Sequence, residues 1–181
     1  MKKSKLIISA LLLGILVVFS SCKNKDDSDS GSTSTKPTTT NGEIKLGGVT
    51  YKIASAVVQI ITDSFEGESY AAITLTSVSL SGKAITVQLA LIYPSSEGIS
   101  GNYPLHTLFS DMPRYLDDWL SNYAIVQGMN MDNYNDLVSG TAKITDKGGN
   151  KFDISFKFKP RNGDEIEGTY SGTVTKQTVG V

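Results

Sequence analysis

The chain has 181 residues, and its globular part has the size of a single ordinary domain. It carries 17 basic against 18 acidic residues, so it has no basic excess to neutralise phosphates, which argues against nucleic acid as a partner. One cysteine excludes an intramolecular disulfide, and one cysteine with one histidine excludes a zinc site of four nitrogen or sulfur ligands.

Residues 1–21 have the pattern of a secretory signal peptide. Lys2, Lys3 and Lys5 give a positive start, and an apolar run over 6–19 is followed by small residues. The run is shorter than the ~20 residues that a membrane-spanning helix needs, so a cleaved leader is expected rather than a permanent span. Loss of the three lysines with the leader would leave 14 basic and 18 acidic residues, a mildly acidic mature chain.

The leader closes on Phe19-Ser20-Ser21-Cys22, which resembles the lipobox of bacterial lipoproteins. In that family a peptidase cleaves before the cysteine, and the thiol and the new amino group are then acylated. Phe19 stands where the family usually has leucine. The resemblance implies lipid attachment at Cys22 and a membrane as a partner, since each buried methylene of an acyl chain contributes ~0.8 kcal/mol.

Residues 22–42 are expected to form the lipidated start of the mature chain and a disordered tether. Over 23–41 there is no large apolar residue, so burial cannot offset the entropy of ordering this segment. Lys25-Asp26-Asp27 resembles the short export signal of surface lipoproteins of Bacteroidota. A solvated charge run is the alternative. With the lipobox, the resemblance implies an outer-membrane lipoprotein of the Bacteroidota type, and exposure on the cell surface is a further expectation.

The region after the tether has a β texture, rich in threonine, valine and isoleucine and punctuated by turn residues. Two segments, 49–62 and 70–80, change the parity of their apolar residues part way, which indicates a bulge or bend in each. The next segment, 84–93, alternates cleanly after the tight-turn pair Ser81-Gly82. The second and third segments are therefore expected to form a hairpin.

Between Ser110 and Tyr123 the apolar period changes from two to about 3.6, which predicts one amphipathic helix at about 111–123. Pro113 is tolerated in a first helical turn. One side of the helix would carry its apolar and aromatic residues, namely Tyr115, Leu116, Trp119, Leu120 and Tyr123. That side is expected to cover an open end or an edge of the sheet.

Three strands are predicted in quick succession at 137–145, 151–159 and 165–176. The middle one shows the cleanest alternation in the chain, and glycine- and asparagine-containing turns separate the three. An antiparallel meander is therefore expected. Gly168 and Gly172 lie on the inner parity of the last strand, which indicates bends or a close approach of a neighbouring group.

The count is about eight strands with no βαβ spacing, so residues 43–178 are expected to form one antiparallel all-β domain with the single helix inserted. Two architectures fit this pattern. One is a closed or partly open barrel that loosely resembles lipocalin-like β lipoproteins of unknown function, and the other is a two-sheet sandwich. Sharp strand bends favour the barrel-like form.

Catalytic constellations are sparse. His106 is followed by Ser110 and Asp111, but there is no Gly-x-Ser-x-Gly elbow, and nearness in sequence does not make a triad. There is no Walker or dinucleotide glycine pattern, so no cofactor is expected. The sequence predicts that the protein is not an enzyme.

One polar segment offers the clustered oxygen ligands that calcium prefers, with Asp132, Asn133, Asn135 and Asp136. It lacks the spacing, the glycine and the distal glutamate of an EF-hand loop. Side-chain hydrogen bonds within an ordinary loop are the alternative interpretation. This is a weak calcium candidate.

Tyr115, Trp119 and Tyr123 are spaced by four and could stack on sugar rings if exposed, whereas packing into the core is the alternative. A tethered β domain without a catalytic constellation favours a lipid-anchored binding or interaction module of the outer membrane. Its ligand would be a small apolar molecule, a glycan or a protein. A structural subunit of a surface assembly is the first alternative, and a hydrolase is the less favoured one.

Overall fold

The structure is a computed structural model, and it describes residues 41–65, 67–79, 82–106, 112–134 and 136–179. The predictions for the signal peptide, for lipid attachment at Cys22 and for most of the tether lie outside these residues. Within the described part, no helix is long and apolar enough to cross a bilayer.

Twelve strands form one sheet in the described part of the chain. Their bounds are β1 Asn41–Leu46, β2 Val49–Phe65, β3 Glu68–Val78, β4 Lys83–Pro94, β5 Gly101–Pro104, β6 Tyr115–Leu116, β7 Asn122–Gln127, β8 Asn130–Tyr134, β9 Leu137–Asp146, β10 Lys151–Pro160, β11 Ile166–Thr173 and β12 Thr175–Val179. The strand pairs are antiparallel, except that β12 runs parallel to β2. The all-β prediction is confirmed, but the count of eight is wrong because it missed short strands such as β6, β8 and β12.

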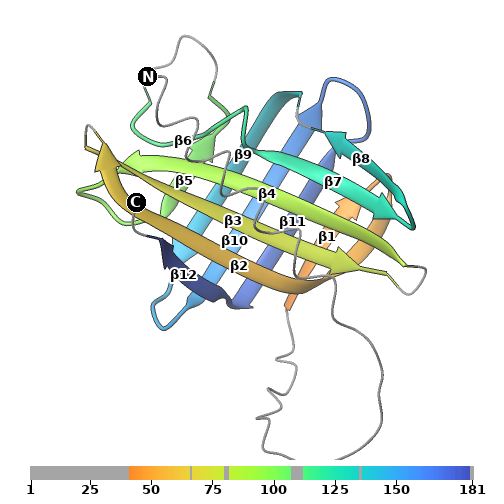
Figure 1. Cartoon of the computed structure of the whole chain (residues 1–181), viewed down its shortest axis with the longest axis horizontal. Coiled ribbons are helices and arrows are strands. Elements are labelled where there is room, and N and C mark those ends of the chain that lie inside the picture. Colours follow the sequence, from red (N-terminus) through yellow and green to blue (C-terminus); the bar gives the residue numbers. More distant parts are fainter. Residues whose placement is uncertain (1–40, 66, 80–81, 107–111, 135, 180–181) are drawn as a thin grey trace, which may run out of the picture. The chain divides into compact units, whose positions relative to one another are not determined.

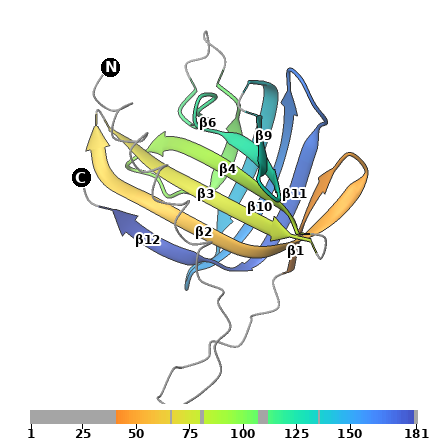
Figure 2. The same cartoon turned by 45° about the vertical axis from the view of Figure 1, so that its right-hand side comes forward.

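The sheet is folded over into two layers. Its order is β5-β9-β10-β11-β1-β2-β3-β4-β7-β8, and this ladder does not close on itself. Strands β2, β3 and β4 cross β9, β10 and β11 at a steep angle, as Figures 1 and 2 both show. The long strand β2 belongs to both layers, since it pairs with β1 before a register shift at Ile53–Ser55 and with β12 after it.

The register shift at Ile53–Ser55 confirms the bulge predicted in the first strand. The second predicted bend is wrong, because β3 pairs with β4 in unbroken register from Glu68 to Val78. Its apparent change of parity is the end of the strand, where Val78 is 53% exposed. The β3–β4 hairpin itself is confirmed.

The core lies between the two layers and is built from the inner parity of each strand. The predicted meander is confirmed as β9, β10 and β11, and the alternation along β10 buries Phe152, Ile154, Phe156 and Phe158. The last predicted strand is in fact two. The chain leaves the β10–β11 ladder at buried Val174 and continues as β12 beside β2.

The predicted helix at 111–123 is wrong for residues 112–123, which instead hold β6, a turn over 118–120 and the start of β7. Leu116 extends the edge of β4 by pairing with Leu91. The Asp117 carboxylate accepts the backbone N–H groups that a helix would use otherwise, and so closes a turn. Two short strands separated by this turn give the same spacing of apolar and aromatic residues, about four positions apart, that predicted a helix.

Candidate functional site

Three side chains form a row across β3, β4 and β6 on the outer face of the sheet. Tyr70 lies opposite Ile92, and Ile92 lies opposite Tyr115. The adjacent residues Leu91 and Leu116 are 1% and 0% exposed and point into the core. Because successive side chains of a strand point to opposite faces, the two tyrosines and Ile92 point away from the core.

His106 extends this row. Its ring centroid lies 4.6 Å from that of Tyr115, with the ring planes tilted by 42°. The backbone N–H of His106 donates to the carbonyl of Leu116 at 3.0 Å, which fixes the histidine beside β6. Ser110 and Asp111, the other members of the sequence-based triad, lie outside the described residues.

Trp119 is presented by the turn that follows β6, and its side chain is 78% exposed. The Asp117 Oδ1 atom accepts hydrogen bonds from the backbone N–H groups of Trp119 at 2.9 Å and Leu120 at 3.1 Å. The turn is also tied to β4, because Ala90 donates its N–H to Ser121 Oγ and accepts the Asp117 N–H. Trp119 therefore stands on a well-anchored turn. We call Tyr70, His106, Tyr115 and Trp119 the aromatic patch.

Two carboxylates accompany the aromatic patch. Glu68 Oε2 accepts the Tyr70 hydroxyl hydrogen bond at 3.1 Å. Burial, and then the negative charges of Glu68 and Asp117 nearby, raise the pKa values of Tyr70 and Tyr115 to about 12. Both hydroxyls therefore keep their protons at neutral pH. The patch offers ring faces for stacking together with hydroxyl donors and carboxylate acceptors for polar contacts.

Arg114 holds β6 and thereby Tyr115 in place. Its guanidinium donates to the carbonyl of Gly98 at 2.9 Å and to the hydroxyl of Tyr103 at 3.1 Å, and it forms an ion pair with Glu97. It also lies 5.9 Å from the ring centroids of Tyr93 and Tyr103. These contacts bind the loop before β5 to the residue that precedes β6.

Of the three predicted aromatic residues, the structure places Tyr115 in the outward row and Trp119 on the turn that follows it. Tyr115 and Trp119 belong to the aromatic patch, but Tyr123 is 0% exposed and packs into the core. Its hydroxyl donates to the carbonyl of Asp164 at 2.8 Å, and its ring stacks on Tyr134 at 4.5 Å. Sequence reasoning missed Tyr70, and it considered His106 only as a candidate member of a catalytic triad. For Tyr70 a signal existed, since it lies on the outer parity of a strand.

The weak calcium candidate does not converge on one point. Asp132 and Asn133 are successive residues of β8, so their side chains point to opposite faces. Asp136 Oδ2 accepts a hydrogen bond from Arg161 Nε at 2.7 Å, and Asn135 lies outside the described residues. Among the residues that the structure describes, no three His, Cys, Asp or Glu side chains are grouped to hold a metal ion.

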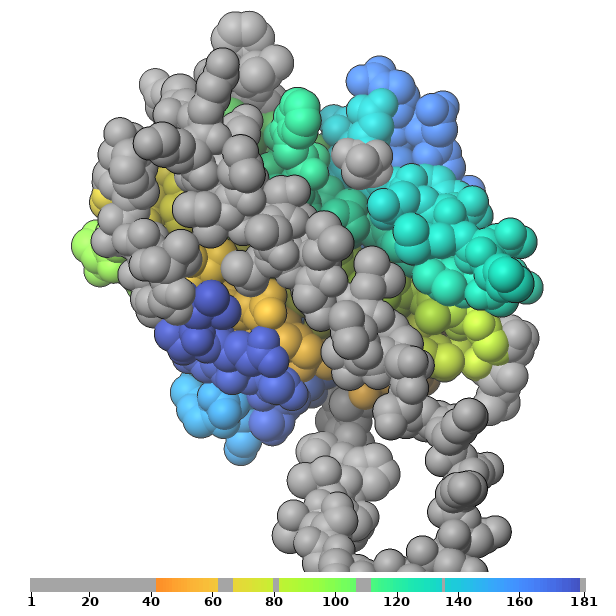
Figure 3. Space-filling view, viewed as in Figure 1, coloured from red at the N-terminus to blue at the C-terminus, as the bar shows by residue number. Residues whose placement is uncertain are grey.

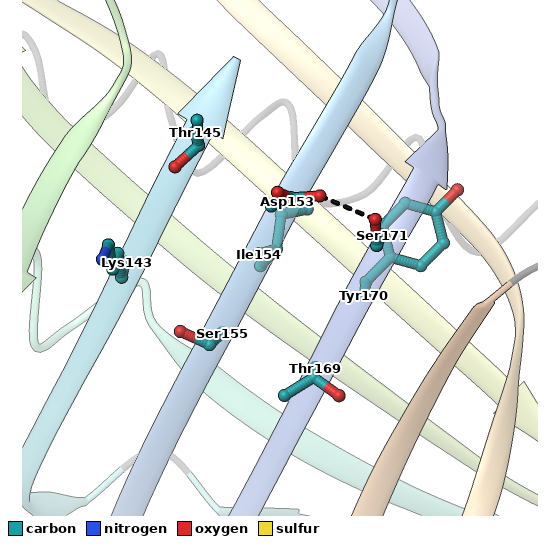
Figure 4. A pocket seen from close by; sticks show the side chains of 8 residues that line it. All are labelled: Lys143, Thr145, Asp153, Ile154, Ser155, Thr169, Tyr170 and Ser171. Carbon is teal, nitrogen blue, oxygen red and sulfur yellow. Dashed lines mark hydrogen bonds between the residues drawn. The ribbon is translucent and has the colours of Figure 1, made fainter. Parts of the chain in front are cut away.

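A second candidate region is a polar hollow of about 390 Å³ on the outer face of β9, β10 and β11 (Figure 4). Its polar lining consists of Lys143, Thr145, Asp153, Ser155, Thr169 and Ser171. One hydrogen bond joins two of these residues, from Ser171 Oγ to Asp153 Oδ1 at 2.7 Å (Figure 4). No sequence motif pointed to this hollow, because it depends on the register of three strands.

Strands β5 and β8 end the strand order, and β12 pairs only with β2, so all three lie at edges of the sheet. In Figure 3, β12 in dark blue and the β7–β8 hairpin in cyan-green lie at different sides of the visible face. Met129 and Met131 beside and within β8 are 104% and 56% exposed. Such edges are where a neighbour's strand would add if the protein were a structural subunit.

Comparisons with family models, curated proteins and solved structures found no match to this chain.

Proposed function

We propose that the protein is a non-catalytic, lipid-anchored module of the outer membrane that binds glycans through the aromatic patch. The observation that carries the proposal is the pair of outward-facing rings of Tyr70 on β3 and Tyr115 on β6, with the His106 ring beside Tyr115, accompanied by the carboxylates of Glu68 and Asp117. Aromatic rings can cover the apolar faces of sugars, while hydroxyl and carboxylate groups bond to sugar hydroxyls.

A saccharide is favoured over a small apolar ligand held inside the domain. Large side chains occupy the space between the two layers, with Tyr103, Tyr123, Tyr170, Phe152 and Phe158 among those that are almost completely buried. An interior filled in this way leaves the outer face as the better supported place for a ligand.

The architecture we propose for this module is a partly open barrel rather than a sandwich. What supports it is β6, which pairs with β4 on one side and makes an isolated bridge from Leu116 to Leu105 on the other. Leu105 directly follows β5, which is one end of the strand order. In such a barrel, β6 would lie between β4 of one layer and the end of β5 in the other. The aromatic patch would then lie where the two layers meet.

Attachment to the outer membrane rests on Cys22 and the lipobox-like residues before it. Cells supplied with a palmitate analogue should label the natural chain, and Cys22→Ser should abolish the label because the acylated thiol is gone. Ser30→Ala, a change in the same polar segment, serves as the control and should keep the label. Equal labelling of the Cys22→Ser variant would disprove the anchor.

Glycan binding is tested by calorimetric titration with a panel of neutral gluco-, manno- and xylo-oligosaccharides. Trp119→Ala and Tyr115→Ala should each weaken binding of the recognised oligosaccharide about tenfold or more, because aromatic residues dominate such contacts. Met131→Ala removes another exposed apolar side chain, on β8, and should bind normally. Thermal unfolding of each variant separates loss of contact from loss of fold.

Two results would contradict the proposal. One is that no oligosaccharide of the panel binds to the natural chain. The other is that an oligosaccharide binds with the same affinity to Trp119→Ala, Tyr115→Ala and the natural chain.

A further inference from the structure

The polar hollow on β9, β10 and β11 is built from two cross-strand rows of outward side chains. In the first row, Ser155 lies between Lys143 and Thr169, and in the second, Asp153 lies between Thr145 and Ser171. The intervening residues of β10 and β11 are buried in the core, which fixes these six side chains on the outer face. The small Ser155 at the centre of its row leaves the surface hollowed there.

The negative charge in the hollow is already balanced. Asp153 forms an ion pair with Lys147 and accepts the hydroxyl hydrogen bond of Ser171. These hydrogen bonds, that from Lys147 first, hold the pKa of Asp153 below its usual value, so it is ionised at neutral pH. Asp153 therefore acts as a fixed, neutralised wall of the hollow and has little attraction left for a cation.

Lys143 differs from Lys147 and Lys157 of this face, which both form ion pairs. Lys157, on the neighbouring strand, pairs with Glu165 at 2.6 Å and Glu167 at 3.8 Å. Lys143 makes no ion pair or hydrogen bond with another described residue, and the same holds for the hydroxyl of Ser155 beside it. The hollow thus combines an unneutralised ammonium with hydroxyl groups that have no partner among the described residues.

We propose that this hollow is a second binding site, which takes the carboxylate of an acidic saccharide. The ammonium of Lys143 supplies charge-assisted hydrogen bonds to the carboxylate, and the hydroxyls of Thr145, Ser155 and Thr169 can donate to or accept from sugar hydroxyls. Lys147 beside Asp153 keeps the local charge positive in a chain whose formal net charge is −1.

A sugar fits the lining better than a lipid headgroup does. Binding to a membrane surface gains much of its strength from apolar side chains that enter the acyl region. The outward side chains of the hollow are polar hydroxyl, ammonium and carboxylate groups. They match a ligand that is itself covered with hydroxyls.

The test is titration of the full chain, in detergent, with trigalacturonate at low and high salt. Trigalacturonate should bind, and the affinity should fall as salt rises. Lys143→Gln should weaken binding about tenfold through loss of a charged hydrogen bond. Ser155→Leu keeps the charge but fills the hollow, and should abolish binding. Lys159→Gln removes a lysine of the neighbouring strand β10 outside the hollow and should bind like the natural chain.

Three outcomes would overturn the inference. The first is an absence of trigalacturonate binding, and the second is an equal loss in Lys143→Gln and Lys159→Gln, which indicates unspecific charge attraction. The third is binding to vesicles of anionic phospholipid that requires Lys143 while trigalacturonate does not bind, which indicates a membrane contact. The ligands and variants differ from those used for the aromatic patch, so failure of either proposal leaves the other to be judged by its own test.

Discussion

Gly168→Ala should destabilise the domain by about 3 kcal/mol, the upper range for overpacking a close-packed core. A Cβ atom at this position of β11 would lie 2.5 Å from Cε1 and 2.6 Å from Cζ of Phe156, and 2.9 Å from the carbonyl oxygen of Glu43. Phe156 is 4% exposed and has little room to move. Because a backbone atom blocks the other side, the methyl group cannot be accommodated by one rotamer change. Denaturant unfolding measures the loss.

Gly98→Ala is the matched control for this substitution, because a Cβ atom there would meet nothing within 4 Å. It should leave the free energy of unfolding almost unchanged. Combining Gly168→Ala with Phe156→Leu should cost less than the sum of the two single changes, since the smaller side chain relieves the collision. A Gly168→Ala variant as stable as the natural chain would show that β10 and β11 do not approach as closely as described.

Stability should be lost between pH 10 and pH 12 through the buried tyrosines. Tyr103 and Tyr123 are both 0% exposed, and burial raises the pKa of each to about 12. The folded pKa lies above the unfolded value of 10.0, so the folded state keeps its protons longer. The stabilisation is complete below pH 10 and disappears as pH rises to about 12. At ~1.4 kcal/mol per pKa unit, each tyrosine accounts for about 2 to 3 kcal/mol.

The measurement is the free energy of unfolding from pH 8 to pH 12.5, with tyrosine ionisation followed by ultraviolet absorbance. Ionisation of the buried tyrosines should coincide with unfolding. Tyr123→Phe removes one of the two groups and should flatten the dependence on pH between 10 and 12, although it also removes the hydrogen bond to the carbonyl of Asp164. A free energy of unfolding that stays constant through pH 12 would contradict the burial of these hydroxyls.

The parts of the fold that sequence could predict are those set by local alternation. The alternation of apolar and polar residues along β10 predicts which side of the strand is buried, so the meander was predictable. The tight turn between β3 and β4 made that hairpin predictable as well. The position of β12 was not, because the chain leaves one layer at Val174 and pairs in parallel with β2 more than a hundred residues earlier. Nothing local in the sequence records that pairing.

Residues 112–123 form strand, turn and strand instead of the predicted helix, and this changes which of the predicted aromatic residues reach the outer face. A helix would place Tyr115, Trp119 and Tyr123 on one side, whereas strand, turn and strand separate them. Tyr123 lies opposite Val87, on the inner face of β4, and is buried with it. Tyr115 pairs on the outer face, and its neighbour Tyr70 could be found only once the register of β3, β4 and β6 was known.

The most direct test of glycan binding at the aromatic patch uses Trp119 itself, which is the only tryptophan of the chain and is 78% exposed. Its fluorescence therefore reports on one place in the molecule. Addition of the recognised oligosaccharide should shift the emission to shorter wavelength in a saturable way, with the same dissociation constant as calorimetry gives. Calorimetric binding that leaves the emission of Trp119 unchanged would place the ligand elsewhere and contradict the account.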